Sequence, residues 1–189
     1  MKNDPALFSA TELLDAYQRK TLSPVEVTKA TLARIEKFNP KFNAFRLVDA
    51  EKALADAKAS EERWIKGEPA GLVDGVPSTI KDLVDTKGWP TRRGSLTTSD
   101  IDTWEKDAPL VARLRENGAV LLGKTTTPEF GWKGVTDSPL TGITRNPWNP
   151  EKTPGGSSGG AAAAAVACLG ALHHGSDGGG SIRMPSGYT

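Results

Sequence analysis

Two glycine-flanked serine sites near the carboxyl end of the chain have the composition of a catalytic loop. Ser157 lies within GGSSGG at 155–160, and Ser181 ends the run Asp177-Gly178-Gly179-Gly180-Ser181. Glycines this dense permit positive φ angles and let backbone N–H groups approach a ligand closely, as a phosphate-binding or oxyanion-stabilising loop requires. The two serines suggest a nucleophile and a helper. Because a serine hydroxyl is a weak nucleophile at neutral pH, such a pair also needs a base.

A lysine at the end of an expected buried strand is the candidate base. Lys81 follows the run VPSTI at 76–80, whereas most other lysines of the chain lie in polar helices or loops. Burial disfavours the charged form of a lysine and can lower its pKa from about 10.4 by up to roughly 3–5 pH units. A neutral Lys81 would then accept a proton, although a surface position is the commoner one for a lysine.

Composition and charge argue against several classes of function. The 189 residues fit about one domain, with 37% hydrophobic and 25% charged residues. The 24 basic and 23 acidic residues give a net charge of +1 and no track for nucleic acid. No run approaches the roughly 20 apolar residues of a membrane span, and the first residues lack the apolar core of a signal peptide. We therefore expect a cytoplasmic protein that binds neither nucleic acid nor membrane.

The first 70 residues or so predict a helical segment. Ser9 and Glu12 have the spacing of a capping box, and the run SPVE at 23–26 repeats it with proline at the first helical position. The second helix should run to about Phe38, where the dipeptide Asn39-Pro40 ends it. The segment is completed by an extended stretch at 44–48 and a charged, solvated helix at 50–66.

From about residue 71 the chain reads as strands alternating with helices, which predicts an α/β architecture with a largely parallel or mixed sheet. Asp107 should cap the helix expected at about 109–117. The expected elements after Lys81 are a helix at about 109–117, a strand at 119–122, an irregular loop at 124–154, a small-residue helix at 161–167 and a short strand at 171–174.

Five other side chains invite a functional interpretation. Trp132 and Trp148, in the irregular loop, could line a pocket or close the core under that loop. His173 and His174 could be metal ligands or a general base, but no acidic or cysteine ligand pattern surrounds them, so we expect no metal site. The single Cys168 cannot form an internal disulfide and should be a small buried hydrophobe.

Two local interpretations of the first serine site compete. The residues at 156–160 match Gly-x-Ser-x-Gly, the nucleophile elbow of α/β-hydrolases, with Ser158 at the centre. An elbow needs a strand immediately before it, and EKTP at 151–154 is a poor strand. The other interpretation is a phosphate cradle at a helix N-terminus, although the Gly-Lys-Ser/Thr of a triphosphate-binding loop is absent.

Taken with Lys81, the two serine sites resemble the amidase signature family of serine hydrolases. The resemblance is carried by GVPSTIKDLVDTKG around Lys81, by the GGSSGG loop and by SDGGGSIRMPSGYT, with separations of 76 (81 to 157) and 24 (157 to 181). It extends over essentially the whole chain, including the amino-terminal helices and the connections GKTTTPEFGW and RNPWNPEKTPGG. It implies that Ser181 is the acylated nucleophile, Ser157 a bridging serine held by a cis peptide, and Lys81 the base.

The roles that the resemblance implies agree with the chemistry of these residues. Neutral Lys81 would take a proton from Ser157, which would take one from Ser181 as that hydroxyl attacks a carbonyl carbon, in place of a histidine and an aspartate. Losing one backbone donor to the tetrahedral oxyanion costs on the order of 2.7–4 kcal/mol in other enzymes. The donors expected here are the N–H groups of Gly178, Gly179, Gly180 and Ser181.

Three further residues flank the proposed relay. Ser158 should hydrogen-bond the lysine or the loop. Asp177 and Arg183 would either pair and fix the shape of the Ser181 loop or act as two independent polar residues. Where many members of the family have an apolar-Gly-Thr-Asp approach to the glycines, this chain has HHGSDG at 173–178, which we interpret as a subfamily variation that leaves the relay intact.

The resemblance implies an α/β fold with a mixed sheet covered by helices. We expect one amidase domain with a helical segment at about 1–70 and a catalytic core at about 71–189. Family members are much longer, so residues 1–189 should be the N-terminal part of an amidase, incomplete on the C-terminal side.

The function implied is hydrolysis of a small-molecule carboxylic amide without a metal or organic cofactor, by a protein that forms a homodimer at full length. Two alternatives remain. One is the glutaminase subunit of the tRNA-dependent amidotransferase, which would pass ammonia to a partner. The other is a non-catalytic module that uses the glycine loops to bind an anion.

Overall fold

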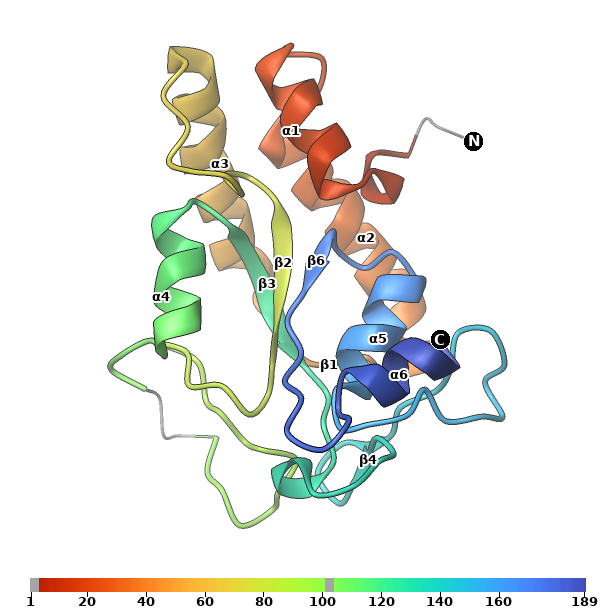
Figure 1. Cartoon of the computed structure of the whole chain (residues 1–189). Helices are drawn as coiled ribbons and strands as arrows, with labels where there is room; N and C mark the ends of the chain where they lie inside the picture. Colours follow the sequence, from red (N-terminus) through yellow and green to blue (C-terminus); the bar gives the residue numbers. More distant parts are fainter. Residues whose placement is uncertain (1–3, 101–103) are drawn as a thin grey trace.

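A four-stranded mixed sheet with the strand order β1-β3-β2-β6 forms the middle layer of the structure (Figure 1). The structure is a computed structural model that describes residues 4–100 and 104–189. β2 (Pro77–Lys81) runs parallel to β3 (Val120–Thr125) and to β6 (Leu172–His173), whereas β1 (Phe45–Val48) is antiparallel to β3. The predicted α/β fold with a mixed sheet is confirmed.

Helices and short elements account for the rest of the described secondary structure. None of the helices in the described residues combines the length and the apolar character needed to cross a membrane. In chain order the elements are η1 (Pro5–Leu7), α1 (Ala10–Gln18), α2 (Pro24–Phe42), α3 (Ala50–Lys66), α4 (Pro109–Glu116), η2 (Glu129–Gly131), the paired strands β4 (Asp137–Ser138) and β5 (Gly142–Ile143), α5 (Gly159–Val166) and α6 (Arg183–Tyr188).

Different helices cover the two faces of the sheet, because successive side chains of a strand point to opposite sides. Val120 and Leu122 of β3 join a core formed with α2, α3 and α5. Leu121, between them, packs with Ile80 of β2 and Val111 of α4 on the other face. The central strands are therefore buried on both sides, which is why they read as short apolar runs in the sequence.

Helix α2 is longer than predicted. Both predicted capping boxes are formed, but α2 continues past Phe38 to Phe42 with Pro40 inside it. Near the end of a helix, proline removes a single backbone donor, and the additional turn brings Phe42 into the core. Asn39 completes this end, because its Oδ1 accepts hydrogen bonds from two backbone N–H groups of the chain leaving the helix, at 2.9 and 2.8 Å.

Asp107 does not cap α4, contrary to the sequence prediction. The N-cap is Ala108, without a side-chain cap bond. The Asp107 carboxylate instead accepts hydrogen bonds from Lys87 N at 2.7 Å and from Arg115 Nε at 3.0 Å, so it ties an earlier loop to the helix.

The strand that follows α4 also continues beyond its predicted end at 122, through a backbone irregularity at Gly123, where φ is +155°.

The tryptophans of the irregular loop and the lone cysteine are more exposed than the sequence indicates. Trp132 is 90% exposed and Trp148 is 75% exposed, so the core-closing role is wrong for both. Cys168 is partly exposed and has a left-handed φ of +54° just after α5. The burial predicted for it is therefore only partial.

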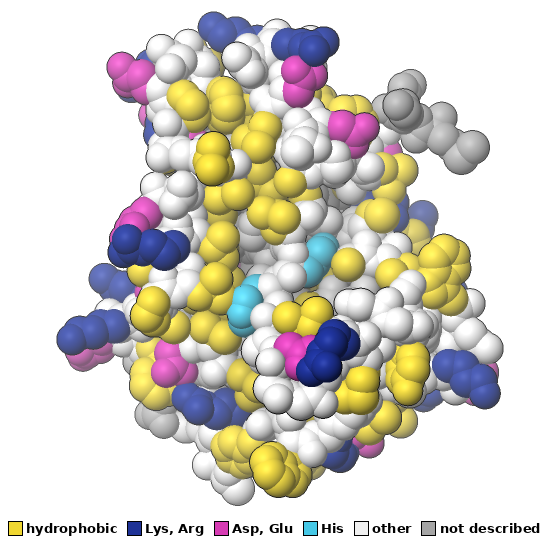
Figure 2. Space-filling model, in the orientation of Figure 1, with side chains coloured by type: hydrophobic (Ala, Val, Ile, Leu, Met, Phe, Trp, Pro, Cys, Tyr) yellow, Lys and Arg dark blue, Asp and Glu magenta, His cyan; other side chains and the backbone are white. Residues whose placement is uncertain are grey.

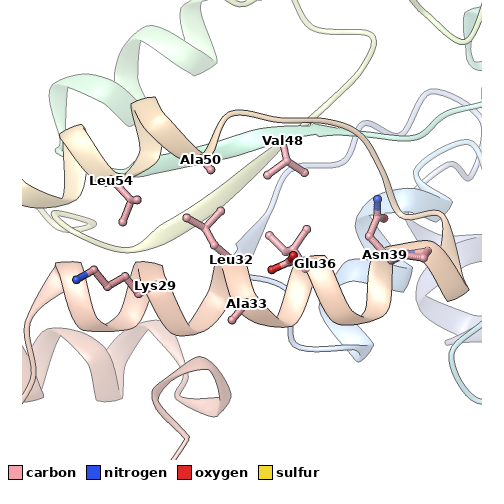
Figure 3. A pocket seen from close by; sticks show the side chains of 10 residues that line it. Lys29, Leu32, Ala33, Glu36, Asn39, Val48, Ala50 and Leu54 are labelled. Atoms are coloured by element: carbon pink, nitrogen blue, oxygen red, sulfur yellow. The ribbon is translucent and has the colours of Figure 1, made fainter.

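A groove of about 610 Å³ lies between α2 and the β1–α3 connection (Figure 3). Its lining is largely apolar, with Leu32 on one side and Val48 and Leu54 on the other, and it also includes the charged residues Lys29 and Glu36. No residue of the predicted relay lines this groove, so it is separate from the candidate active site.

The start of α5 is packed so closely against Thr126, the residue that follows β3, that a methyl group at one position should destabilise the fold. A Cβ on Gly160 would lie 2.5 Å from the backbone nitrogen and 2.6 Å from the carbonyl oxygen of Thr126. We expect Gly160→Ala to lower the free energy of unfolding by about 1–3 kcal/mol, the usual cost of overpacking. Gly187→Ala is the matched control, because no atom lies within 4 Å of its Cβ. Equal denaturation midpoints in urea for the two variants would contradict this packing.

Candidate active site

Lys81 ends β2 with a fully buried side chain, and its Nζ faces three serine hydroxyl groups. Nζ lies 2.7 Å from Ser157 Oγ, 2.9 Å from Ser158 Oγ and 3.0 Å from Ser176 Oγ. Three hydroxyl acceptors match the three N–H donors of an ammonium group. The fold thus brings Lys81 and Ser157, which are 76 residues apart in the sequence, into direct contact.

The glycines of the GGSSGG loop are required where the backbone passes another segment. A Cβ on Gly156 would lie 2.5 Å from the carbonyl oxygen of Val135. The peptide bond between Gly156 and Ser157 is cis, as the family resemblance implied. Ser158 is the N-cap residue of α5. The four residues before the loop form no strand, so the nucleophile-elbow interpretation of Ser158 is wrong.

Asp177 organises the loop that carries Ser181. Its carboxylate accepts hydrogen bonds from the backbone N–H groups of Gly180 at 2.6 Å, Ile182 at 3.1 Å and Arg183 at 3.1 Å. It also accepts from Arg183 Nε at 3.0 Å and from an Arg183 terminal nitrogen at 2.9 Å. These bonds, the Arg183 side chain first among them, hold the pKa of Asp177 far below its ordinary value. The predicted pair between Asp177 and Arg183 is present.

The Ser181 loop adjoins the lysine site through the backbone. The carbonyl oxygen of half-buried Ser181 accepts a hydrogen bond of 3.2 Å from Ser158 N. The N–H of Gly180, one of the expected oxyanion donors, is occupied by Asp177. In residues 4–100 and 104–189, no hydrogen bond uses the N–H groups of Gly178, Gly179 or Ser181, so these three are the donors open to a ligand.

Burial makes it easier for Lys81 to lose its proton. Loss of water around the ammonium group lowers the pKa of Lys81 to about 8, and the negative charge of Asp177 acts in the opposite direction. At mildly alkaline pH a large share of Lys81 is therefore neutral and able to accept a proton.

The two histidines reach the face that carries α5 and α6 (Figure 2) but are poorly suited to act as the base. Burial lowers the pKa of His173 to about 4, and its ring bonds Thr79 Oγ1 at 3.1 Å and the carbonyl oxygen of Gly170 at 3.2 Å. Burial and the charges of Lys81 and Lys124 lower the pKa of His174 to about 4. In the described part of the chain, no three His, Cys, Asp or Glu side chains gather where they could hold a metal.

Sequence reasoning missed Ser176. Its Oγ lies 3.0 Å from Lys81 Nζ, nearly as close as the 2.9 Å of the predicted neighbour Ser158. The residue lies in the SDGGGS motif beside Asp177, but spacing alone did not indicate that its side chain would reach the lysine.

A second buried lysine on β3 was also missed. Lys124 Nζ donates to the carbonyl oxygen of Val84 at 2.6 Å and lies 3.5 Å from a carboxylate oxygen of Asp82. Asp82 in turn accepts from Arg46 Nε at 2.7 Å. This network fixes the turn that follows Lys81. The signal that could have found it is a lysine after a second apolar strand, in LLGKT at 121–125.

Comparison with known proteins agrees with this geometry. The family model described as Amidase matches residues 26–189. The chain belongs to the amidase family.

Individual relatives include hydrolases and a component of an amidotransferase. The chain is 42% identical over 179 residues to the indoleacetamide hydrolase of Bradyrhizobium diazoefficiens, covering 95% of this chain and 34% of that protein. It is 44% identical over 188 residues to a glutamyl-tRNA(Gln) amidotransferase subunit of Salinispora tropica, covering 98% of this chain and 38% of that one. The solved structure of a bacterial aryl acylamidase superposes with a TM-score of 0.90 at 36% identity, covering 95% of this chain and 37% of that chain. This amidase chain thus spans between a third and two fifths of the length of these relatives.

The position of Lys81 predicts a direct titration in the protein. With isotope-labelled lysine side chains, NMR should show Lys81 titrating near pH 8, with the resonance assigned by its loss in Lys81→Met. Asp177→Asn should move the titration to lower pH, because it removes the charge that favours the ammonium form. His174→Gln is the control and should leave it in place, since His174 is already neutral there. A Lys81 titration near the ordinary value of about 10.4 would show that the side chain is solvated.

Proposed function

We propose that this amidase chain carries the catalytic residues of an amidohydrolase that works through a serine acyl-enzyme. The observation that supports the proposal most directly is the 2.7 Å contact between the buried Nζ of Lys81 and Ser157 Oγ. A base is effective when its pKa lies near the working pH, and burial lowers the pKa of Lys81 to about 8.

In the proposed reaction, the proton of Ser157 moves to Lys81 Nζ and the proton of Ser181 moves to Ser157 as Ser181 Oγ attacks the amide carbonyl carbon. The N–H groups of Gly178, Gly179 and Ser181 stabilise the oxyanion that forms. The C–N bond then breaks, Ser157 gives a proton to the leaving nitrogen, and Lys81 returns its proton to Ser157. Water attacks the acyl-enzyme by the same relay and releases the carboxylic acid.

The proposed substrate is a small-molecule amide, as the names of the amidase relatives suggest. An anion-binding module would use the same open N–H groups of the Ser181 loop, but it gives no role to the buried contact between Lys81 Nζ and Ser157 Oγ and is therefore less well supported. The amidotransferase component remains a second candidate, because the chain is 44% identical to such a protein. Hydrolysis of glutamine only when partner subunits are added would favour that candidate. The cytoplasmic location and the homodimer stay predictions of the sequence.

Ser181 should be the residue that reacts with an acyl-enzyme probe. In the intact protein that contains this chain, a fluorophosphonate should label Ser181, and hydrolysis of a simple aryl amide should be measurable. Ser181→Ala should abolish both, because in the proposed reaction no other hydroxyl gives its proton to Ser157 and attacks the carbonyl carbon. Ser186→Ala, an exposed serine on the following helix, is the control and should react like the wild type. Labelling that persists in Ser181→Ala would remove Ser181 from the nucleophile role.

The relay also predicts how the effects of substitutions combine. Lys81→Ala should lower kcat by roughly 10²–10⁴-fold, the usual contribution of a positioned base. Adding Ser181→Ala to it should cost little beyond the larger single effect, because residues that act as one unit are not additive. Wild-type kcat should fall as pH drops below about 8, and a variant lacking both histidines should keep this limb. Additive losses, or a limb that vanishes with the histidines, would contradict a lysine relay.

A further inference from the structure

A lysine base has to present its lone pair to one chosen hydroxyl, and Lys81 has three within hydrogen-bond distance. Protonated Nζ has three N–H groups and can donate to all of them. Neutral Nζ has two N–H groups and one lone pair. One of the three contacts must therefore reverse its direction when Lys81 loses its proton, and the structure indicates which one.

The contact with Ser158 cannot reverse, because the hydrogen bonds of its hydroxyl are already assigned. Ser158 Oγ donates to the carbonyl oxygen of Ser176 at 3.3 Å and accepts from Ser176 N at 3.2 Å. With Lys81 as a second donor, both of its lone pairs and its single proton are in use. Ser158 therefore accepts a hydrogen bond from Lys81 in either charge state of the lysine.

The remaining two hydroxyls differ in burial. Ser157 is 1% exposed, and in the described residues Lys81 Nζ is the partner that its hydroxyl contacts. If Ser157 accepted from Lys81, its own proton would be left buried without an acceptor, which is costly. Ser176 is exposed and can give its proton to water while it accepts from Lys81. The contact that reverses is therefore the one with Ser157.

We propose that Ser176, together with Ser158, is a positioning residue that occupies the two N–H groups of neutral Lys81 and so aims the lone pair of Nζ at the Ser157 hydroxyl. This inference rests on the proposed function. When the proton passes from Ser157 Oγ to Nζ, the O–H bond breaks and an N–H bond forms, and the other two contacts of Nζ keep their direction. Ser176 thus acts through Lys81 and does not itself exchange a proton with Ser157, Ser181 or substrate.

Other charged and titratable groups surround Lys81, but they act on it in ways that do not depend on Ser176. Asp177 in the nucleophile loop favours the charged lysine. His174, after β6, has its pKa lowered to about 4 and is neutral over the pH range of the lysine. Asp82 and Lys124 pair with each other, and Asp82 also pairs with Arg46.

The test compares two side chains of the same shape at position 176, in the intact protein. Ser176→Thr keeps a hydroxyl, whereas Ser176→Val replaces it by a methyl group. Ser176→Thr should retain a plateau kcat within a few-fold of wild type. Ser176→Val should lower it about tenfold or more, as part of the roughly 10²–10⁴-fold contribution of a positioned base, with little change in KM. The acidic limb of Ser176→Val should also move to lower pH, because the ammonium form has lost an acceptor.

The combination of a lower plateau with a limb at lower pH separates positioning from a purely structural role, which would lower the plateau without moving the limb. NMR titration of Lys81 in both variants measures the same shift without turnover, and Ser176→Ala repeats the comparison if the valine variant does not fold. Equal plateaus and equal titrations for Ser176→Thr and Ser176→Val would overturn the inference. Failure of the wild-type protein to react with a fluorophosphonate would instead overturn the proposed function.

Discussion

The desolvation of the Lys81 ammonium group is the constraint on which the candidate site depends. A side chain that is fully buried at the end of β2 has lost most of its water, and the groups that replace it are three neutral hydroxyls. Hydroxyls satisfy the donors of the lysine without stabilising its charge as a carboxylate would, so the neutral base stays accessible. Lys124 on β3 is buried as well, and burial lowers its pKa to about 8 even though the adjacent Asp82 carboxylate acts in the opposite direction.

Asp177 is the negative charge that opposes the effect of burial on the pKa of Lys81. A carboxylate in direct contact with Lys81 would favour its charged form, yet the Ser181 loop needs a strong acceptor to fix its shape. The structure meets both requirements by directing Asp177 to Arg183 and to three backbone N–H groups. Asp177 therefore raises the pKa of Lys81 only by its field, which is a smaller effect than burial.

Sequence patterns predicted best where one local signal had a single structural solution. Capping boxes, the strand before Lys81 and the charged helix at 50–66 each follow from such a signal, and the structure has all of them. The predictions failed where a tertiary contact changed a local preference, as where Pro40 is tolerated in α2 because Phe42 reaches the core. Ser176 was missed for the same reason. Its contacts depend on how the loop after β6 folds beside the start of α5, which no spacing of residues in the sequence encodes.

The packing of α5 against the sheet holds Ser157 and Ser158 next to Lys81. Ser157 and Ser158 immediately precede the first turn of α5, a helix made largely of glycine and alanine, and Ala163 and Ala164 are fully buried in the core that β3 joins. Because the interior is close-packed, a larger side chain on this face would push the helix away from the sheet. A displacement of about 1 Å would lengthen the 2.7 Å contact between Lys81 and Ser157 beyond hydrogen-bond distance. The alanine run, which the sequence predicts as a small-residue helix, therefore fixes the distance between Lys81 and Ser157, the two residues that exchange a proton in the proposed reaction.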